Sequence, residues 1–295
     1  MGAVAAQPLV DLRADFPVLH RSFNGKRLVY LDSGASAQKP RQVIEAMERF
    51  YSTSYGTVHR GVYELGREAT EMFEGARERI AGFVGWDSDC SIYTRNATEA
   101  INLVAGAWGR SQLGPGDQVL ITEMEHHSNI VPWQLLCEDR GARLRYLSVS
   151  DSGELSLDEL DAALAGGRVK LVAFAHVSNV LGTINPVEEI VRRARAAGAV
   201  TVIDGAQAVP QLPVDLGAID ADFYAWTGHK ALGPTVGMLH GRRERTRPRG
   251  RTARRCRAGA GPRPRRTRPR RADRRWAARR RSGPRPRAGA RARRP

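Results

Sequence analysis

Residues 200–235 read VTVIDGAQAVPQLPVDLGAIDADFYAWTGHKALGPT, and the stretch contains two short apolar runs with polar ends. The first run, 199–203, stops at Asp204, and the second, 222–226, leads into a turn that holds Lys230. Apolar runs of this length are typical of buried parallel strands, and ligands bind at the carboxyl ends of such strands in open α/β sheets. The stretch therefore predicts an acid and a lysine at the ends of two strands of one sheet.

The rest of the chain alternates apolar runs with amphipathic segments of about ten residues. This alternation predicts an α/β fold with a doubly wound, mainly parallel sheet and flanking helices. Expected strands cover 28–31, 91–94, 117–122, 143–148, 169–175, 199–203 and 222–226, and expected helices cover 11–19, 40–51, 64–82, 100–108, 133–140, 157–164 and 186–197. If the strands are parallel, the polar residues after 122, 175 and 203 lie on one carboxyl edge.

The acid and the lysine suggest a specific chemistry. Partial burial and nearby cationic groups lower the pKa of a lysine and make Lys230 a candidate Schiff-base former. An acid is the usual partner of the pyridinium nitrogen in pyridoxal 5′-phosphate (PLP) sites. The alternative is that Asp204 caps a helix and that Lys230 lies on the surface. The occurrence of both motifs in this order favours the cofactor site.

Several motifs carry a family resemblance. They are YLDSGASAQKP at 30–40, NATE at 96–99, MEHHSNIVPW at 124–133, HVSNVLGT at 176–183, DGAQA at 204–208, DFYAWTGHK at 222–230 and GPT at 233–235. Together they resemble the class V, fold-type I PLP enzymes. The greatest similarity is to the cysteine desulfurase and selenocysteine lyase group, which supplies sulfur for iron–sulfur cluster assembly.

The resemblance implies a role for each matching residue. Lys230 would hold PLP as a Schiff base and move protons, and His126 would stack on the pyridine ring and shuttle protons. Asp204 would pair with the ring nitrogen, Gln207 would bind the phenolate oxygen, and Asn179 would lie near the 3′-oxygen. The phosphate would be held by Thr98, Thr227 and His229.

Three further features leave alternatives open. The polar turn at 95–99 opens a helix and would offer free N–H groups to a phosphate, or Asn96 or Thr98 would simply cap that helix. His126 and His127 are adjacent and point to opposite faces of an extended chain, so no metal site is expected. The loop 55–63, YGTVHRGVY, contains His59 and Arg60, which are either site residues or exposed.

Charge divides the chain into two unlike parts. The 295 residues carry a net charge of +16, yet residues 242–295 contain 25 Arg and two acids, a net of +23, which leaves 22 basic and 29 acidic residues in 1–241. Arg, Ala, Pro and Gly, all encodable by G and C alone, make up 46 of these last 54 residues. We interpret the tail as disordered and as the product of a reading frameshift. The alternative is an Arg-rich arm that binds nucleic acid.

The expected organisation is an N-terminal segment at 1–20, a truncated PLP-binding large domain at 21–241, a tail at 242–295 and no small C-terminal domain. No apolar run is long enough to span a membrane and no secretory signal is present, so we expect a cytoplasmic protein without a membrane or specific nucleic-acid partner.

The resemblance implies a homodimeric cysteine desulfurase. It would take sulfur from L-cysteine, or selenium from L-selenocysteine, and pass sulfur as an enzyme persulfide to an acceptor protein, leaving alanine. Another class V enzyme, an aminotransferase or a kynureninase-like lyase, is the alternative. The family's loop cysteine and its carboxylate-binding arginine belong to the later half of the family chain. None of the three cysteines of this sequence, Cys90, Cys137 and Cys256, matches that loop cysteine. We therefore expect this polypeptide to be impaired.

Overall fold

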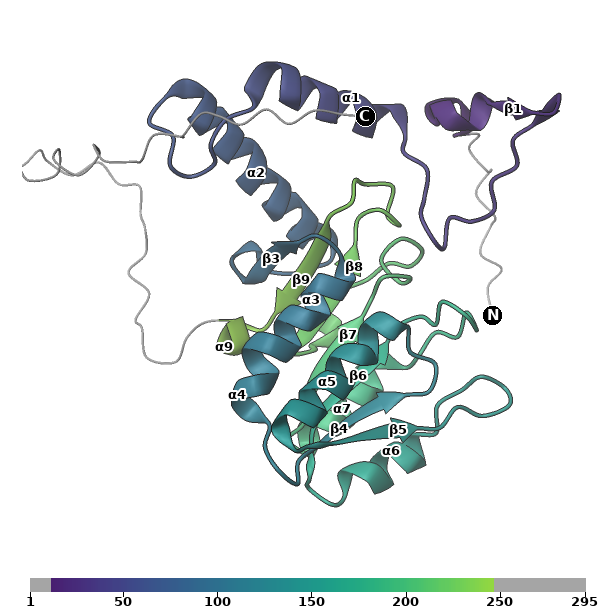
Figure 1. Ribbon diagram of the computed structural model, residues 1–295, viewed down its shortest axis with the longest axis vertical. Coiled ribbons are helices and arrows are strands. Elements are labelled where there is room, and N and C mark those ends of the chain that lie inside the picture. The colour runs from purple at the N-terminus through teal and green to yellow at the C-terminus, as the bar shows by residue number, and fades with distance from the viewer. Residues whose placement is uncertain (1–11, 247–295) are drawn as a thin grey trace, which may run out of the picture. The chain divides into compact units, whose positions relative to one another are not determined.

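A computed structural model describes residues 12–246, which are built around a seven-stranded sheet (Figure 1). All its strands run in the same direction except β9, which is antiparallel to both of its neighbours. The order across the sheet is β3-β9-β8-β7-β6-β4-β5. The strands are β3 (Ser91–Thr94), β4 (Gln118–Thr122), β5 (Arg143–Leu147), β6 (Val169–Ala175), β7 (Val200–Asp204), β8 (Phe223–Thr227) and β9 (Gly237–Gly241). The predicted mainly parallel α/β sheet is confirmed.

Strand β9 was not among the expected strands, and it is the one that joins β3 to the rest of the sheet. Met238 lies opposite Tyr93 of β3 on one side and Trp226 of β8 on the other. At Gly237, a Cβ atom would lie 2.4 Å from the carbonyl carbon of Asn96, so a side chain does not fit there. The sequence GMLHG has glycine at both ends and little strand propensity, and it becomes a strand because two partners pair with it.

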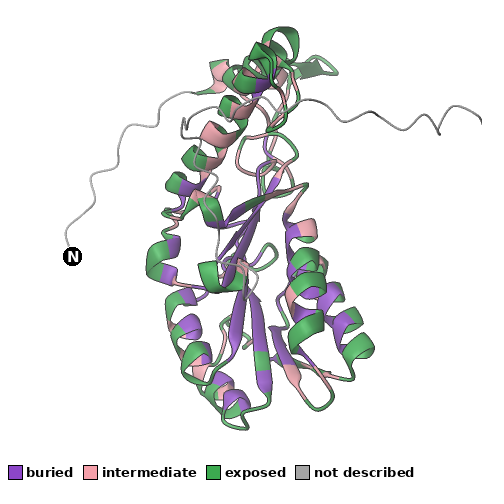
Figure 2. Ribbon diagram, turned by 90° about the vertical axis from the view of Figure 1, so that its left-hand side faces the viewer, coloured by how far each residue is buried: buried purple, intermediate pink, exposed green. Residues whose placement is uncertain are grey.

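Helices cover both faces of the sheet and bury two apolar clusters (Figure 2). Alternate strand residues point to opposite faces, so Val172 packs in one cluster while Leu171 and Ala173 pack in the other. One face is covered by α6 (Leu157–Leu164), α7 (Val187–Ala196), α8 (Leu216–Ile219) and the end of α2 (Glu64–Phe83). The other is covered by α3 (Ala97–Leu103), the π-helical turn η5 (Val104–Gly109) and α5 (Val131–Arg140). Cys137 is buried in α5.

The segment before the sheet differs from the prediction. It has two 3₁₀ turns, η1 (Arg13–Asp15) and η2 (Pro17–His20), and a small hairpin of β1 (Ser22–Phe23) and β2 (Lys26–Arg27). The expected strand at 28–31 is wrong: these residues pair with no strand within the described chain, and Val29 and Leu31 are 68% and 91% exposed. An apolar run forms a strand only when a partner edge is available to it.

Helix α1 (Arg41–Arg49) and the turn η3 (Phe50–Ser54) follow Pro40, as predicted. The apolar face expected for this helix is not covered within residues 12–246, because Met47 is 45% exposed and Val43 and Phe50 are only partly buried. Three short helical turns lie between the longer elements: η4 (Ser88–Cys90), α4 (Arg110–Gln112) and η6 (His127–Asn129).

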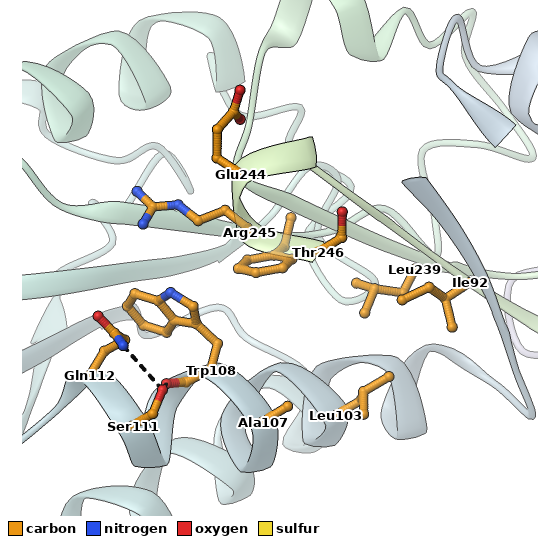
Figure 3. Close-up of a pocket in the computed structure, with 11 residues that line it drawn as sticks. Ile92, Leu103, Ala107, Trp108, Ser111, Gln112, Leu239, Glu244, Arg245 and Thr246 are labelled. Atoms are coloured by element: carbon orange, nitrogen blue, oxygen red, sulfur yellow. Dashed lines mark hydrogen bonds between the residues drawn. The ribbon is translucent and has the colours of Figure 1, made fainter. Parts of the chain in front are cut away.

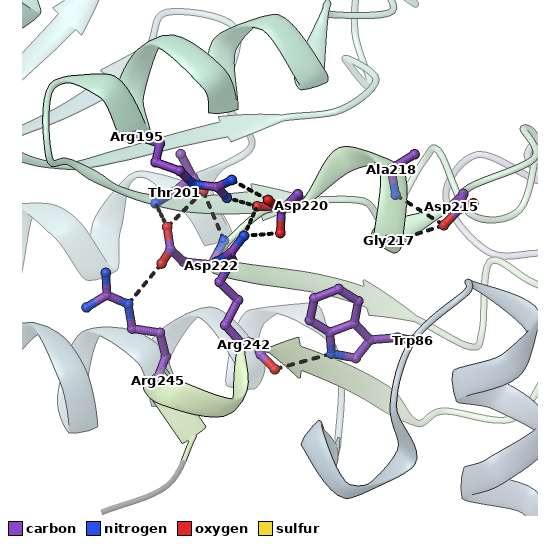
Figure 4. A network of polar contacts seen from close by, with 11 residues as sticks. Trp86, Arg195, Thr201, Asp215, Gly217, Ala218, Asp220, Asp222, Arg242 and Arg245 are labelled. Carbon is purple, nitrogen blue, oxygen red and sulfur yellow. Dashed lines mark hydrogen bonds and ion pairs between the residues drawn. The ribbon is translucent and has the colours of Figure 1, made fainter. Parts of the chain in front are cut away.

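A polar network holds the end of the described chain, α9 (Arg243–Thr246), against the amino-terminal edge of the sheet (Figure 4). The buried carboxylate of Asp222 accepts a hydrogen bond from the Thr201 amide at 3.1 Å and pairs with Arg245 Nε at 2.9 Å. Asp220 pairs with both Arg195 and Arg242. These contacts fix the residues after β9, and they lie at the opposite end of the strands from the carboxyl edge of the sheet.

Residues 1–11 and 247–295 lie outside the described structure, as do the predictions that fall on them: the first part of the N-terminal segment 1–20, Cys256 and all but the first five residues of the Arg-rich tail. Between residues 12 and 246, none of the helices is both long and apolar enough to cross a membrane.

Candidate active site

A cavity of about 550 Å³ lies at the carboxyl edge of the sheet. It is lined by residues that follow five different strands, β3, β4, β6, β7 and β8, together with the loop 31–35. All eight residues predicted from the sequence line this cavity: Thr98, His126, Asn179, Asp204, Gln207, Thr227, His229 and Lys230. The parallel strands account for this convergence, because their carboxyl ends meet at one edge.

Asp204 is the most deeply buried acid of the cavity, at 7% exposure. One carboxyl oxygen accepts a hydrogen bond from the Ala206 amide at 2.9 Å. Burial raises the pKa of Asp204, while that hydrogen bond and the charges of Lys230 and His126 act in the opposite direction. A buried carboxyl of this kind gains most from a cationic partner, because the partner stabilises the charged form that burial disfavours.

Lys230 lies half-buried in the turn after β8. Burial lowers the pKa of its amine, and the negative charge of Asp204 acts against that shift. The turn is tightly closed, because the Gly228 amide donates to the Val236 carbonyl at 2.6 Å and the Gly233 amide donates to the Gly228 carbonyl at 2.8 Å. A Cβ at Gly228 would lie 2.9 Å from the Val236 side chain, so this close approach requires glycine.

His229 joins the lysine turn to the segment 36–39. The amide of Ala37 and the amine of Lys39 donate to the His229 carbonyl at 3.0 and 2.9 Å, and the ring Nδ1 lies 3.3 Å from the Ser36 hydroxyl. The pKa of His229 is lowered first by burial and then by the charges of Lys230 and Lys39. The imidazole is therefore held mainly neutral beside two lysines.

His126 is exposed to the cavity at the start of the turn η6. Its Nδ1 lies 2.8 Å from the Ser128 hydroxyl and accepts from the Ser128 amide at 3.1 Å. An Nδ1 that accepts from an amide carries no proton, so the hydroxyl donates to it and the ring's N–H is at Nε2 when the ring is neutral. The Asn129 amide donates to the His126 carbonyl at 2.7 Å, which fixes the backbone of the turn.

The polar residues on the remaining walls are oriented by local bonds. Gln207 is buried and donates to the Gly34 carbonyl at 2.9 Å, which links the end of β7 to the loop 31–35. Asn96 caps α3 by accepting from the Glu99 amide at 2.8 Å, so the cap expected as an alternative is present, while the next-but-one residue, Thr98, lines the cavity. Asn179 is exposed at the rim.

Three polar lining residues were not assigned to the site from the sequence: Asp32, Asn96 and Ser128. Asn96 and Ser128 each lie two residues from a predicted site residue, Thr98 and His126, within the same motif. This closeness in sequence could have assigned them to the site. His59 and Arg60 do not line the cavity of this chain; His59 Nε2 lies 3.2 Å from Glu74 Oε1 instead. In the part of the chain that the structure describes, no three His, Cys, Asp or Glu residues are grouped to hold a metal ion.

A second cavity, of about 410 Å³, lies between the helical run 103–112 and the edge of the sheet formed by β3 and β9 (Figure 3). Its walls are mainly apolar, with Trp108 and Phe223 in edge-to-face contact at 6.4 Å between ring centroids. Polar groups line it in two places: at the end of the helical run, where Gln112 donates to the Ser111 hydroxyl at 3.1 Å, and at α9, which contributes Glu244, Arg245 and Thr246. None of the predicted site residues lines it.

Comparison with known proteins gives a consistent result. Residues 29–251 match the family described as aminotransferase class-V. Curated cysteine desulfurases from Enterobacter sp. (strain 638) and Dickeya dadantii (strain 3937) are 51% and 50% identical over 235 and 239 residues. These alignments cover 79% and 80% of this chain but 58% of each relative, so the chain spans less than two thirds of their length.

Solved structures match over a similar share of the chain. The apo structure of a cysteine desulfurase from Thermococcus onnurineus NA1 matches with a TM-score of 0.74 and 36% identity, covering 79% of this chain and 57% of that one. A cysteine desulfurase from Escherichia coli matches with a TM-score of 0.70 and 37% identity, covering 79% and 58%.

Proposed function

The chain belongs to the aminotransferase class-V family of PLP-dependent enzymes, and from this we propose that its cavity binds PLP and serves the desulfuration of L-cysteine. The observation that carries the proposal is the convergence of eight side chains, from the ends of five strands, on one cavity with a buried acid and a half-buried lysine. The cysteine desulfurase relatives favour this reaction over transamination or a kynureninase-like cleavage.

The chemistry of the lining residues fits the cofactor. Asp204 is a buried carboxyl whose pKa is raised, because burial destabilises its charged form. A cationic ring nitrogen beside it would stabilise that charged form. Lys230 supplies an amine whose pKa is lowered, so a larger share of it is uncharged and nucleophilic. Thr98, Thr227 and His229 supply hydroxyl and imidazole groups for the phosphate.

The remaining assignments concern the ring. His126 would contact the ring face, and the Ser128 hydroxyl fixes which of its nitrogens carries the proton. Gln207 would donate its second amide hydrogen to the phenolate oxygen, since the first is used by the Gly34 carbonyl. Asn179 would contact the same atom, the 3′-oxygen of the ring.

When bound, PLP supplies an aldehyde that captures amines and a ring that withdraws electrons from the adjacent carbon. In our proposal Lys230 provides the resident amine and then moves the proton at the substrate α-carbon. Asp204 keeps the ring nitrogen protonated through this step. The carbon–sulfur bond of cysteine breaks as a thiol takes the sulfur, so cysteine and a thiol give alanine and a persulfide. An acceptor protein would then receive the sulfur. Homodimer formation is part of the same proposal.

The first experiment tests cofactor binding. Purified full-length protein is mixed with PLP, and its visible absorption spectrum is recorded before and after borohydride. We expect a visible band that borohydride removes, together with cofactor that stays bound after dialysis. Lys230→Ala should abolish both effects. Lys170→Ala, a matched change at an exposed lysine of β6, should change neither. Equal labelling of all three proteins would refute the assignment of Lys230.

The second experiment tests the reaction separately. Alanine and protein-bound sulfur are measured after adding L-cysteine and a thiol, without any keto acid. Alanine formed in this mixture supports desulfuration, because transamination requires an amino-group acceptor. Cofactor binding without alanine would leave the PLP assignment in place and contradict the proposed desulfuration by this chain.

A further inference from the structure

Glu125 is a buried acid that no part of the proposed mechanism uses. It stands directly before His126 and is 8% exposed. Adjacent residues of an extended segment point to opposite sides, so His126 faces the cavity while Glu125 faces the interior. A carboxyl group in this position needs hydrogen-bond partners to compensate for its loss of water.

The partners of Glu125 come from three parts of the fold. Oε1 accepts from the Thr122 hydroxyl, at the end of β4, and from the Ala175 amide at 2.9 Å, at the end of β6. Oε2 accepts from Asn129 Nδ2 at 2.6 Å, in the turn η6. The carboxyl group therefore ties the turn that carries His126 to two strand ends, one of which lines the cavity through Ala175.

The direction of these bonds is fixed by Trp133. The indole N–H can only donate, and it donates to Asn129 Oδ1 at 2.9 Å, which leaves the Asn129 amide nitrogen facing Glu125. Asn129 and Trp133 are both fully buried, so neither can turn to water. Every group around Glu125 is thus a donor, an arrangement that a carboxylate satisfies and an amide does not.

The same carboxyl group lies beside the strand that ends in Asp204. Its partner Ala175 is paired in register with Asp204, and the charge of Asp204 raises the pKa of Glu125 further after burial has raised it, to about 7 overall. Lys230, His126 and Tyr224 are the other titratable groups that interact with Asp204. Two buried acids therefore lie close together: Asp204 lines the cavity, and Glu125 lies behind the cavity wall in the interior.

We propose that Glu125 is a positioning residue of this site: it fixes the turn that presents His126, and its negative charge beside Asp204 strengthens the binding of a cationic ring. The proposal rests on the function proposed above. It assigns no contact between Glu125 and the cofactor. Its effect on binding reaches the cofactor through Asp204 and His126.

The test uses the change Glu125→Gln in the full-length chain. Gln keeps the size of the side chain, removes the charge and turns a donor toward Asn129 Nδ2. The probe is pyridoxamine 5′-phosphate, which has no aldehyde and so does not react with Lys230. At pH 8 we expect the variant to bind it roughly tenfold more weakly than wild type, the factor that corresponds to one pKa unit. At pH 5.5 the difference should shrink, because Glu125 is then protonated in wild type as well.

Two controls separate positioning from general damage. The double change Glu125→Gln with Asn129→Asp restores matching donors and acceptors along the chain to Trp133, and it should recover folding and much of the lost affinity. Glu138→Gln, an exposed change on α5, should bind like wild type at both pH values. A loss of affinity that is equal at both pH values and is not recovered by the double variant would overturn the proposal.

A measurement on ligand-free protein tests the role of Glu125 separately from the proposed binding of PLP. The carboxyl carbon of Glu125 is titrated by NMR in wild type and in the Asp204→Asn variant, or in Asp204→Ala if the first does not fold. Loss of the neighbouring charge should lower the Glu125 midpoint by about one pH unit, because the charge of Asp204 raises the pKa of Glu125. An unchanged midpoint would overturn the inference, whether or not the protein binds pyridoxamine 5′-phosphate. Failure of wild type to bind that probe would count against the proposed function alone.

Discussion

His240 in β9 is expected to make the protein sensitive to mild acid. The ring is 1% exposed. Its Nε2 accepts from Trp226 Nε1 at 2.9 Å, and its Nδ1 lies 2.8 Å from the Ser91 hydroxyl. Because the indole can only donate, Nε2 carries no proton and Nδ1 does, so the neutral ring satisfies both partners. A second proton at Nε2 would break the bond to Trp226 and place a charge in the core.

The magnitude follows from the pKa values. Burial lowers the pKa of His240 to about 4, against about 6.5 in the unfolded chain. Between these values the unfolded chain binds a proton that the folded chain does not, so the free energy of unfolding falls as the pH falls from 6.5 toward 4. From pH 7 to pH 5 this residue alone removes about 2 kcal/mol. That is a large part of the 5–15 kcal/mol typical of a domain.

The assay is urea unfolding of wild type and the His240→Gln variant at pH 7 and pH 5. Glutamine offers a carbonyl to the indole and an amide to the Ser91 hydroxyl, and it does not titrate. Glu125 and Asp204, whose pKa values are raised, act in the opposite direction in both proteins, so only the difference between the two proteins isolates His240. Wild type should lose about 2 kcal/mol more than the variant. Equal losses would show that His240 is not held neutral by burial.

Three further outcomes are expected from urea unfolding at pH 7. Gly205→Ala should lower stability by 1–3 kcal/mol or more, roughly the effect of overpacking, because its Cβ would lie 2.1 Å from the ring of Tyr224; an unchanged midpoint would contradict that packing. Asn96→Ala should cost about 1 kcal/mol through loss of the helix cap, whereas Asn96→Asp should cost much less. Asp222→Ala should destabilise by about 3 kcal/mol or more, because the buried acid is the partner of Arg245, and the loss should exceed that of an exposed ion pair.

The sequence predicts most of the sheet because its inner strands are buried on both faces. The run 169–175 and the helix 157–164 have the predicted bounds, and the ends of β4, β7 and β8 differ from them by one residue. These elements owe their form to local apolar patterns that a packed core then satisfies. The eight site residues follow such strands, so their convergence on one edge could also be predicted.

The errors in the strands concern pairing, which local patterns do not encode. The apolar run 28–31 has no partner strand within the described chain and forms no helix or strand, while 237–241 has a weak pattern and two partners. Glu125 was overlooked for a related reason. Its significance comes from donors at Thr122, Ala175 and Asn129, and the contact with Ala175 joins residues 50 positions apart.

The position of β9 also governs the order in which the chain can assemble during synthesis. Among the strands that the structure describes, β3 pairs only with β9, so it has no place in the sheet until residues 237–241 have been made. Until then β8 has an open edge, and α3, which carries Thr98, is placed only by its packing against β7 and β8. Pairing over such a sequence distance is intrinsically slow. The cavity is thus completed late, by a strand that contributes no residue to its lining.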